Sequence, residues 1–365
     1  MVLTHVITNF EGVGGAETML VRLIKATPEV KHKVISLIGI SQFYIDELQA
    51  NEVELKELNI KGPLSLLFIA PYKLICELSR DDVVMSWMYH ACVVAGFVKL
   101  IKPYYKVFFN VRHSLDTFDK ESLSTRLAIY VSRFLSRKVD STIYCSKTAM
   151  KQHLDFGFYR NKAVYIPNGY DFSGNENSLP VNGIEFVIGS LGRFHKAKDY
   201  PNLLKAFSLL RKKYKNVRLR IGGKGISIAN EDFALLLKRN ELNQFSVDAL
   251  GPIENVQEFY GGIDLFVLSS ITEGFPNVLV EAMARKLPVV STNVGDALNI
   301  LKNDSFICPS SDPQKLSELM EEIYLMSPEK RQLLGSQNQT NVMTNYQISQ
   351  ISKIYMSLFN DKDTM

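Results

Sequence analysis

The feature that most constrains the fold is a regular alternation: apolar runs of strand length are followed by longer segments with helical periodicity. In residues 1–170 the predicted strands cover 3–8, 33–38, 82–87, 106–111 and 141–145. Helical patterns such as 16–26 and 122–137 lie between them. Strands that alternate with helices of this length are typical of parallel α/β units, in which each helix crosses back over the sheet.

The same alternation returns in the second half of the chain. Predicted strands cover 185–191, 217–221, 246–250, 265–268 and 289–291, and predicted helices cover 200–213, 276–285 and 313–326. Between the halves, residues 168–183 are rich in turn formers and predict a linker. We therefore predict two doubly wound α/β domains, residues 1–170 and 171–345, with the site in the cleft between them. The helical pattern of the last segment, 346–365, predicts a helix that packs back on the first domain.

Composition excludes several classes of protein. Apolar residues make up 46% of the 365 residues and charged residues 22%, as in ordinary soluble domains. The four cysteines show no C-x-x-C spacing, so neither a zinc site nor a redox pair is indicated. No basic region precedes an apolar run at the start, and the uncharged stretch 83–98 is too short to span a bilayer. We expect a protein of the cytoplasm or of the cytoplasmic face of the inner membrane.

Positive charge is concentrated in the first half, where residues 1–170 hold 21 Lys and Arg against 16 Asp and Glu. This balance favours contact with anionic lipid or a phosphorylated substrate, although ordinary surface charge is the other interpretation. One segment mixes cations with apolar and aromatic residues, which predicts peripheral contact with an anionic membrane: Lys99, Leu100, Ile101, Lys102, Tyr104, Tyr105 and Lys106. The alternative is that the rings are core and the lysines solvated. No aromatic and basic platform for nucleic acid is visible.

The most informative segment is EGFPNVLVE, which runs from Glu273 to Glu281 after a strong predicted strand. Pro276 suits the first turn of a helix, so Glu273 lies before the helix and Glu281 within it. The first-turn amides of Asn277 and Val278 then offer a phosphate site. A carboxylate further along can accept hydrogen bonds from a ribose diol.

A second segment, GSLGRFHKAKDY, opens the second domain at the end of its first strand. Glycine lets a ligand approach the backbone closely, and several basic side chains follow before the next helix. Arg193 can grip a phosphate with two parallel hydrogen bonds, and Lys198 supplies a point charge. Together they can neutralise a diphosphate leaving group, unless this is simply a basic surface loop.

The glycine-rich loop NFEGVGGAE follows the first strand and superficially suggests a dinucleotide-binding fingerprint. The third glycine of that fingerprint would fall at position 17, which is Glu17, and the next strand ends without an acidic residue. Neither the third glycine nor the acidic residue that a dehydrogenase would need is therefore present. Space for a substrate beside Gly14 and Gly15 fits better, with a tight turn as the alternative.

His113 lies just past the strand 106–111, at the sheet edge where sites of α/β proteins gather. Its position and the neighbouring Arg112 favour a catalytic role over a purely structural one. The glycine-rich segment 222–225 is a weaker signal for a loop at the same site.

These motifs, in this order, resemble the retaining family 4 glycosyltransferases of GT-B fold, particularly bacterial enzymes that make surface polysaccharides such as O-antigen and capsule. The resemblance covers nearly the whole chain. It is carried by the GGAE loop at 14–17, NVRHS at 110–114, IPNG at 166–169, Gly192-Arg193 with Lys198, Leu250-Gly251, and the two glutamates Glu273 and Glu281.

The resemblance implies two Rossmann-like domains that face each other across a cleft, and transfer of a sugar from a nucleotide diphosphate donor to a glycan or lipid-linked acceptor. It implies retention of configuration and no metal or other cofactor. Arg193 and Lys198 would bind the diphosphate, Glu281 the ribose, and Glu273 the donor sugar, while His113 assists from the acceptor side. The nucleotide-sugar site would also include Asn277, Val278, Gly251, Ile253, Gly14 and Gly15.

Other classes remain open at this point. A GT-B epimerase would use the same nucleotide sugar without an acceptor, and a non-catalytic binding module would lack the first glutamate and the histidine. Lys286 departs from the small residue common in the family, and the sequence around His113 departs from the plainer aliphatic-His-Gly pattern. The sequence names neither the donor sugar and base nor the acceptor, the linkage or the oligomeric state.

Overall fold

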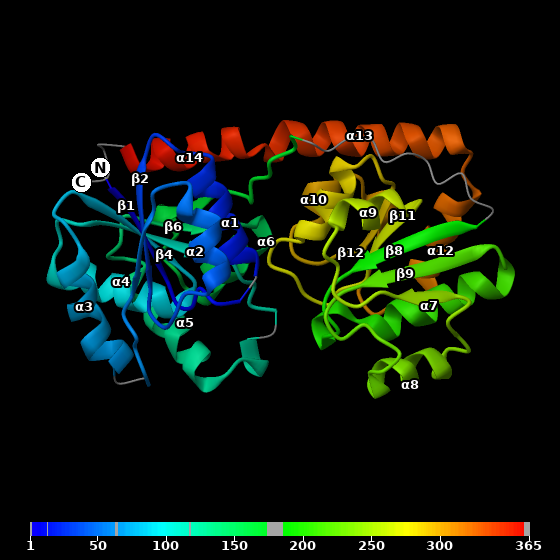
Figure 1. Cartoon of the computed structure of the whole chain (residues 1–365), viewed down its shortest axis with the longest axis horizontal. Helices are drawn as coiled ribbons and strands as arrows, with labels where there is room; N and C mark the ends of the chain where they lie inside the picture. Colours follow the sequence, from blue (N-terminus) through cyan, green and yellow to red (C-terminus); the bar gives the residue numbers. More distant parts are fainter. Residues whose placement is uncertain (1, 13, 63–64, 117, 174–184, 361–365) are drawn as a thin grey trace. The chain divides into compact units, whose positions relative to one another are not determined.

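The structure is a computed structural model of the chain, and it describes residues 2–12, 14–62, 65–116, 118–173 and 185–360. The chain forms two compact units (Figure 1). Unit 1 comprises Met1–Asp171 together with Tyr346–Met365, and unit 2 comprises Phe172–Asn345. Each unit is built on its own parallel sheet with helices on both faces, which confirms the predicted α/β class.

The sheet of unit 1 has seven strands in the order β3-β2-β1-β4-β5-β6-β7. These are β1 (Val2–Ile7), β2 (Lys31–Ser36), β3 (Glu54–Glu57), β4 (Asp82–Trp87), β5 (Lys106–Val111), β6 (Ser141–Tyr144) and β7 (Ala163–Tyr165). The helices are α1 (Gly15–Lys25), α2 (Gln42–Gln49), the π-helical η1 (Ser65–Ile69), α3 (Ala70–Glu77), α4 (Tyr89–Ile101), η2 (Phe118–Lys120), α5 (Leu123–Leu135), α6 (Lys147–Phe156) and η3 (Arg160–Lys162). Because the strand order reverses at β1 and β4, their carboxyl ends form the switch point where α/β sheets bind ligands.

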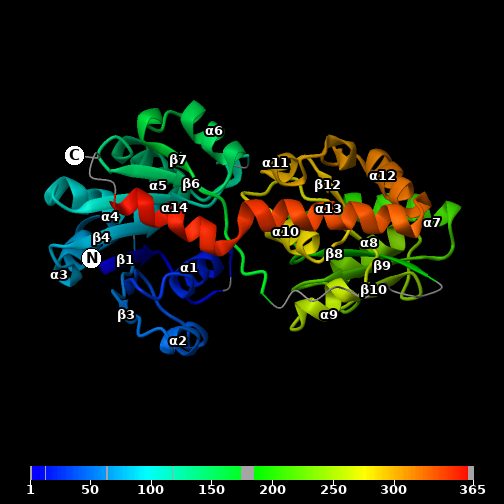
Figure 2. The ribbon, with the colours of Figure 1, turned by 90° about the horizontal axis from the view of Figure 1, so that it is seen from above.

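Both faces of this sheet are covered, which is why its central strands are rich in apolar residues. On one face, strand residues such as Leu3 and Met85 pack against α1 and the C-terminal helix α14 (Ile348–Asn360). On the other face, Val6 and Val84 pack against α3 and α4. Figure 2 shows α14 in red over the sheet of unit 1. The last helix of the chain is therefore part of the first unit's core.

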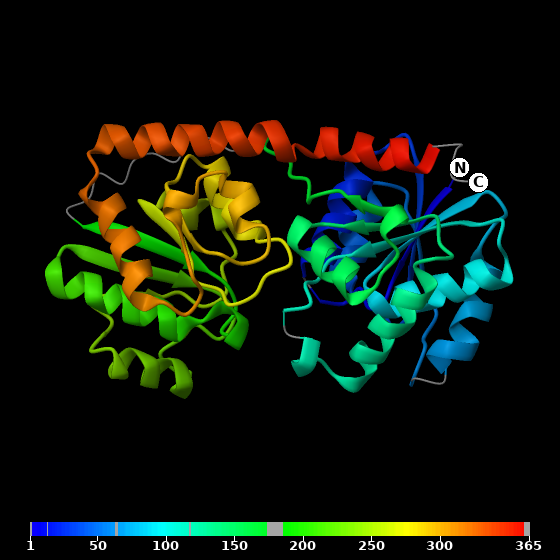
Figure 3. The same ribbon diagram turned by 180° about the vertical axis from the view of Figure 1, so that it is seen from behind.

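The sheet of unit 2 has six strands in the order β10-β9-β8-β11-β12-β13. These are β8 (Phe186–Leu191), β9 (Val217–Gly222), β10 (Val247–Ala249), β11 (Leu265–Leu268), β12 (Val289–Thr292) and β13 (Ile307–Cys308). The helices, seen from behind in Figure 3, are η4 (Lys196–Lys198), α7 (Tyr200–Lys213), α8 (Glu231–Arg239), α9 (Val256–Gly261), α10 (Asn277–Ala284), α11 (Ala297–Leu301), η5 (Asp304–Phe306), α12 (Pro313–Leu325) and α13 (Pro328–Tyr346). The switch point of this sheet lies between β8 and β11.

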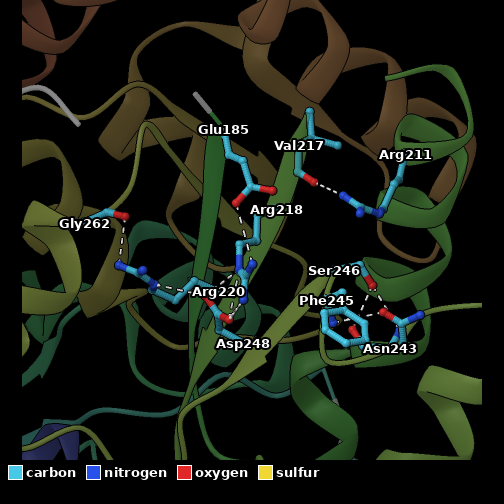
Figure 4. A network of polar contacts seen from close by, with 10 residues as sticks. All are labelled: Glu185, Arg211, Val217, Arg218, Arg220, Asn243, Phe245, Ser246, Asp248 and Gly262. Carbon is cyan, nitrogen blue, oxygen red and sulfur yellow. Dashed lines mark hydrogen bonds and ion pairs between the residues drawn. The ribbon is translucent and has the colours of Figure 1, made fainter. Parts of the chain in front are cut away.

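A cluster of charged residues is centred on β9 in unit 2 (Figure 4). Arg218 binds the Asp248 carboxylate through both its Nε and its terminal nitrogens and lies 3.6 Å from Glu185. Arg220 donates to the carbonyl oxygen of Gly262 at 2.9 Å. Both arginines are paired with Asp248 within the fold, so they are not candidates for a diphosphate site.

The predicted linker begins as part of unit 1. The Tyr170 backbone N–H donates to Tyr346 at 2.8 Å, and the Ile348 N–H donates back to Tyr170 at 2.8 Å. Residues 174–183 of the predicted linker lie outside the described part of the chain. Within the described ranges, none of the helices combines the length and the apolar character that crossing a bilayer requires.

Candidate functional site

At the switch point of unit 2, two predicted site residues from distant parts of the chain meet. Lys198 ends the short helix η4 after β8, and Glu273 lies in the loop after β11. The Lys198 Nζ is 2.6 Å from Glu273 Oε1, and both side chains are largely buried. Ser270 donates to the same carboxylate oxygen at 2.7 Å. This is an oriented lysine–carboxylate pair at the edge where parallel sheets bind ligands.

The backbone around this pair is fixed from both strands. Ser269 donates to the Lys198 carbonyl oxygen at 2.8 Å, and the Ile271 N–H donates to Ala197 at 2.8 Å. Beneath it, burial and then the charge of Glu273 raise the pKa of Tyr200, so this phenol stays neutral. The loop after β11 is therefore held to the loop after β8 by the hydrogen bonds of Ser269 and Ile271.

Glycines bring two backbone loops together beside Arg193. A Cβ on Gly223, which has φ +146°, would lie 2.0 Å from the Gly192 carbonyl oxygen. The Gly192 N–H donates to Gly222 at 2.9 Å, and the Phe194 N–H donates to Lys224 at 2.7 Å. Arg193 follows directly and is exposed, and it forms no ion pair with any residue in the described ranges. Its guanidinium is therefore available to an anionic ligand.

The segment with Gly251 and Ile253, both predicted for the nucleotide-sugar site, joins the same loops. The Gly223 N–H donates to the Gly251 carbonyl oxygen at 2.6 Å, and Gly251 itself has φ +70°. Ile253 lies against Gly222, where an added Cβ would come within 2.4 Å of the isoleucine side chain. The structure thus brings Gly251 and Ile253 to the edge that carries Arg193.

Helix α10 begins one residue later than the sequence predicts. Pro276 is its N-cap, and Asn277 and Val278 form the first turn. Glu281 lies one turn further along, where the Tyr260 hydroxyl donates to its Oε2 at 3.4 Å. The Tyr260 hydroxyl also lies 3.1 Å from the Val278 carbonyl oxygen, which links Glu281 to the first turn of the helix. A helix start with a carboxylate one turn behind it suits a phosphate followed by a ribose.

In unit 1 the glycine loop lies where β1 ends. Gly14 caps α1 in extended conformation, and an added Cβ would lie 2.6 Å from a Glu17 carboxylate oxygen. Gly15 is the first residue of the helix. Burial raises the pKa of Glu17, with a backbone hydrogen bond acting in the opposite direction. Gly14 therefore makes room for a half-buried carboxylate at the switch point.

His113 lines a cavity of about 360 Å³ at this edge of unit 1. Its Nε2 lies 2.9 Å from Glu121 Oε1, and both side chains are partly exposed to the cavity. Glu17 and Tyr89 line the same cavity. A histidine held by a carboxylate in a polar cavity can orient or take the proton of a substrate hydroxyl.

Two residues that line this cavity each carry a buried side-chain oxygen atom with no hydrogen-bond partner in the described part of the chain. The two atoms are Thr8 Oγ1 and Asn9 Oδ1. Unpaired buried oxygens are costly, so a bound hydroxyl compound that donates to them would recover that free energy. Thr8 also borders an adjoining, more apolar cavity of about 350 Å³, which is lined by Leu37, Ile38, Ile60, Gly62, Leu66, His90 and Ser124.

Arg112, which supported the assignment of its neighbour His113, has a structural role instead. It donates to Asn168 and to the Tyr355 hydroxyl, and its guanidinium stacks 5.1 Å from the Trp87 ring. Arg112 therefore links helix α14 to the sheet of unit 1, and it is not among the residues that line the cavity.

Several side chains of the segment 99–106, on which the prediction of membrane contact rests, form contacts within unit 1. Lys99 pairs with Asp140 at 2.9 Å, and Lys106 donates to the Phe359 carbonyl oxygen at 3.2 Å. Tyr105 is core, so the prediction that its ring lies at headgroup depth is wrong; Ile101 and Tyr104 are exposed. This surface offers one unengaged lysine, Lys102, among the three.

Glu121, Thr8 and Asn9 are candidate site residues that sequence reasoning missed. Thr8 and Asn9 end the first strand, so the strand-end rule could have found them. Glu121 carries no such signal, because the turn η2 folds it back toward His113. Among the described residues, no group of three His, Cys, Asp or Glu side chains is arranged to hold a metal ion.

Two family models match consecutive parts of the chain. "Glycosyltransferase Family 4" matches residues 13–173, and "Glycosyl transferases group 1" matches residues 172–341. The boundary between the two matches coincides with the boundary between the two units.

Relatives and solved structures match over nearly the full length. An uncharacterized glycosyltransferase of Haemophilus influenzae is 25% identical over 90% of this chain and 94% of its own. The capsular polysaccharide biosynthesis glycosyltransferase CapH of Staphylococcus aureus is 23% identical over 94% and 96%.

The crystal structure of Anabaena Alr3699/HepE in complex with UDP superposes with a TM-score of 0.84 at 18% identity, covering 98% of this chain and 99% of that one. The apo form of the lipopolysaccharide outer core galactosyltransferase WaaB gives 0.77 at 15% identity, over 98% and 99%. Two parallel-sheet units in this order, matched along their length by both family models, make the chain a family 4 glycosyltransferase of GT-B fold.

Proposed function

We propose that the chain transfers a sugar from a nucleotide diphosphate donor to a glycan acceptor during synthesis of a bacterial surface polysaccharide. The observation that carries this proposal is the buried Lys198–Glu273 pair at the switch point of unit 2, with the exposed Arg193 beside it. Two cations can take up the charge that develops on a diphosphate leaving group. A carboxylate held between Lys198 and Ser270 is positioned to accept hydrogen bonds from sugar hydroxyls.

Named relatives support the substrate class. Anabaena HepE has been solved with UDP and with UDP-glucose, and CapH and CapM of Staphylococcus aureus are named for capsular polysaccharide biosynthesis. A uridine nucleotide is therefore the first donor class to test. In this proposal unit 2 binds the donor, with Glu281 on the ribose and the start of α10 near the phosphates.

The acceptor belongs to unit 1 in this proposal. Its hydroxyl donates to Thr8 or Asn9 in the polar cavity, and His113, oriented by Glu121, contacts the same hydroxyl. Gly14 and Gly15 leave room for the substrate beside them. Transfer with retention of configuration and without a metal ion is proposed together with this assignment, because the cations that face the leaving group are supplied by Arg193 and Lys198.

The place of action proposed is the cytoplasm, where nucleotide sugars are made, with peripheral contact at the inner face of the membrane. A lipid-linked saccharide is then an accessible acceptor. The cavity lined by Leu37, Ile38 and Ile60 beside the polar one supports an acceptor with an apolar part.

The test uses the purified full chain and a panel of UDP- and other nucleotide sugars. Donor binding is screened by thermal shift, and products are analysed with and without a lipid-linked glycan. Transfer that requires the acceptor, persists in chelator and preserves the anomeric configuration is the expected result. Conversion of the donor alone into an epimer would assign the chain to the epimerases instead, and loss of activity in chelator with rescue by a divalent ion would overturn the metal-free mechanism.

A further inference from the structure

Helix α5 in unit 1 is apolar on the face that it turns to solvent. Its buried residues, Ala128, Ile129, Ser132 and Leu135, pack inward. Leu123, Leu127, Tyr130 and Phe134 follow one another at intervals of three and four residues on the opposite side, which aligns them in one row. Leu123 is 81% exposed and Phe134 is 65% exposed. We call this row the α5 stripe.

The charged side chains within the α5 segment itself are all basic. Residues 122–139 contain four basic residues and no aspartate or glutamate. Arg133, Arg137 and Lys138 are exposed, while Arg126 is half-buried and stacks 5.2 Å from the Phe118 ring. An apolar row edged by cations that have no acidic neighbour along the helix is complementary to a surface with an apolar interior and negative headgroups.

A second group of exposed apolar residues lies on η1 and α3. Phe68 and Tyr72 are 73% and 70% exposed, and Lys73 lies beside them. Leu67 of η1 packs in the same core cluster as Ala128 and Ile129 of α5. In Figure 1 both α3 and α5 lie along the lower edge of unit 1, and the view from behind in Figure 3 agrees.

The apolar cavity of unit 1 is lined from both groups. Leu66 of η1 and Ser124 in the first turn of α5 both contribute to its wall. Ser124 is hydrogen-bonded to His90 at 2.9 Å, and His90 borders the polar cavity that contains His113. The apolar chain of an acceptor bound in this cavity can therefore extend out of the cavity on the side of unit 1 that carries the α5 stripe.

We propose that the α5 stripe, with Phe68 and Tyr72, is the surface by which the protein docks on an anionic lipid bilayer. The apolar side chains enter the headgroup region, and Arg133, Arg137 and Lys138 lie near lipid phosphates. A second copy of the chain fits this surface less well, because the same stripe would bring further arginines and no carboxylate to pair with them. The docking surface deepens the proposed membrane contact and rests on it; donor binding by unit 2 does not depend on it.

Flotation with vesicles of phosphatidylglycerol and phosphatidylcholine, compared with phosphatidylcholine alone, tests the proposal on the full chain. Binding to the anionic vesicles that falls with added salt is expected. Each removed cation should lower the partition coefficient about fivefold, so Arg133→Gln/Arg137→Gln/Lys138→Gln should lower it roughly a hundredfold. Leu127→Ser/Phe134→Ser should lower it at least tenfold, since about two apolar side chains are lost. The matched control is Phe245→Ser/Leu325→Ser, which replaces equally exposed residues of unit 2 and should bind like wild type.

The depth to which residue 134 enters the bilayer gives an independent readout, and it does not require a variant that weakens binding. Phe134→Trp adds a reporter to a chain whose single tryptophan, Trp87, is fully buried. Brominated acyl chains should quench the new fluorescence and leave that of wild type unchanged. Equal binding of the stripe and control variants, an unquenched Phe134→Trp, or a self-association that Leu127→Ser/Phe134→Ser abolishes would each overturn the docking surface. Calorimetry with UDP, run on the same samples, reports separately on the proposed donor site.

Discussion

Lys198 Nζ and Glu273 Oε1 lie 2.6 Å apart although 75 residues separate them in the sequence. The two loops that carry them follow β8 and β11, which are neighbours in the sheet of unit 2. Their pairing is therefore a direct result of parallel strand order.

Replacing Lys198 or Arg193 by alanine should reduce kcat/KM about 30- to 1000-fold, because one preorganised electrostatic donor is worth roughly 2–4 kcal/mol in a transition state. Steady-state kinetics with saturating acceptor measure this. The matched control is Lys196→Ala, a change of an exposed neighbouring lysine that should leave kcat/KM within threefold of wild type. Values within threefold for Lys198→Ala and Arg193→Ala would contradict the leaving-group assignment.

Glu281→Ala should weaken binding of the nucleoside diphosphate about 10- to 100-fold and slow the chemical step much less. A hydrogen bond to a charged group contributes roughly 1.5–3 kcal/mol, and a ribose contact is made equally before and during transfer. Isothermal calorimetry with UDP measures the loss. Glu258→Ala, which removes an exposed glutamate on α9, is the control; unchanged affinity in Glu281→Ala would rule out the ribose contact.

Glu121→Gln should lower kcat about tenfold or more while UDP affinity stays at the wild-type value, because Glu121 acts through His113 on the acceptor side. His113→Ala should lower kcat at least as much, and the double variant should be no worse than His113→Ala alone. Asp119→Asn, an exposed acid two residues away, serves as the control. Additive losses in the double variant would show that the two residues act independently.

Unit 1 should lose stability in mild acid before unit 2 does. Trp87 Nε1 can only donate, so His5 Nδ1 accepts at 3.2 Å, and His5 Nε2 donates to His32 Nδ1 at 3.0 Å. Burial lowers the pKa of His5 and His32, and lowers that of His153 to about 4. The unfolded chain takes up protons below its ordinary histidine pKa of about 6.5, and the folded chain does not. Stability is therefore complete above about pH 6.5 and falls toward pH 4.

Each such histidine contributes up to about 1.4 kcal/mol per pH unit across this range. Urea unfolding at pH 7.5 and 5.5, followed by hydrogen exchange in peptides of each unit, measures the difference. His153→Gln should flatten the pH dependence of unit 1. Equal loss in both units between these two pH values would contradict the assignment, since the only histidine of unit 2, His195, is exposed.

Gly223→Ala should destabilise unit 2 by roughly 2–4 kcal/mol and abolish donor binding. The added Cβ meets the Gly192 carbonyl oxygen at 2.0 Å in a backbone conformation that other residues rarely adopt. Thermal unfolding and UDP binding together measure the effect. Gly261→Ala, at a glycine with nothing within 4 Å of the added Cβ, should leave both unchanged.

Most strands could be predicted because burial on both faces of a sheet makes them rich in apolar residues. The edge strands β3, β7 and β13 could not. β3 has the sequence ELKE with a single apolar residue, β7 has three residues and β13 has two, so each is too polar or too short to be recognised as a strand. The uncharged stretch 83–98 likewise joins most of β4 to much of α4, because both elements are buried.

The placement of Lys198 and Glu273 in the segments after β8 and β11 could be predicted, because strand ends can be located without any knowledge of packing. The pairing of His113 with Glu121 could not, since it depends on the turn η2 and on the start of α5. Arg112 shows the opposite error: adjacency to His113 suggested chemistry, and its contacts with Asn168 and Tyr355 show a structural role.

The placement of α14 in unit 1 sets the order in which the protein can fold as it is synthesised. Ile348, Ile351, Tyr355 and Phe359 complete the core of the first unit, and Asn110 and Arg112 both bond the Tyr355 hydroxyl. Residues 172–345 of unit 2 leave the ribosome before residues 348–360 do, because they come first in the chain. The second unit can thus begin to fold while the first still has an open apolar groove, which closes only when α14 has emerged. A stop codon before residue 348 would leave that groove permanently open to chaperones and proteases.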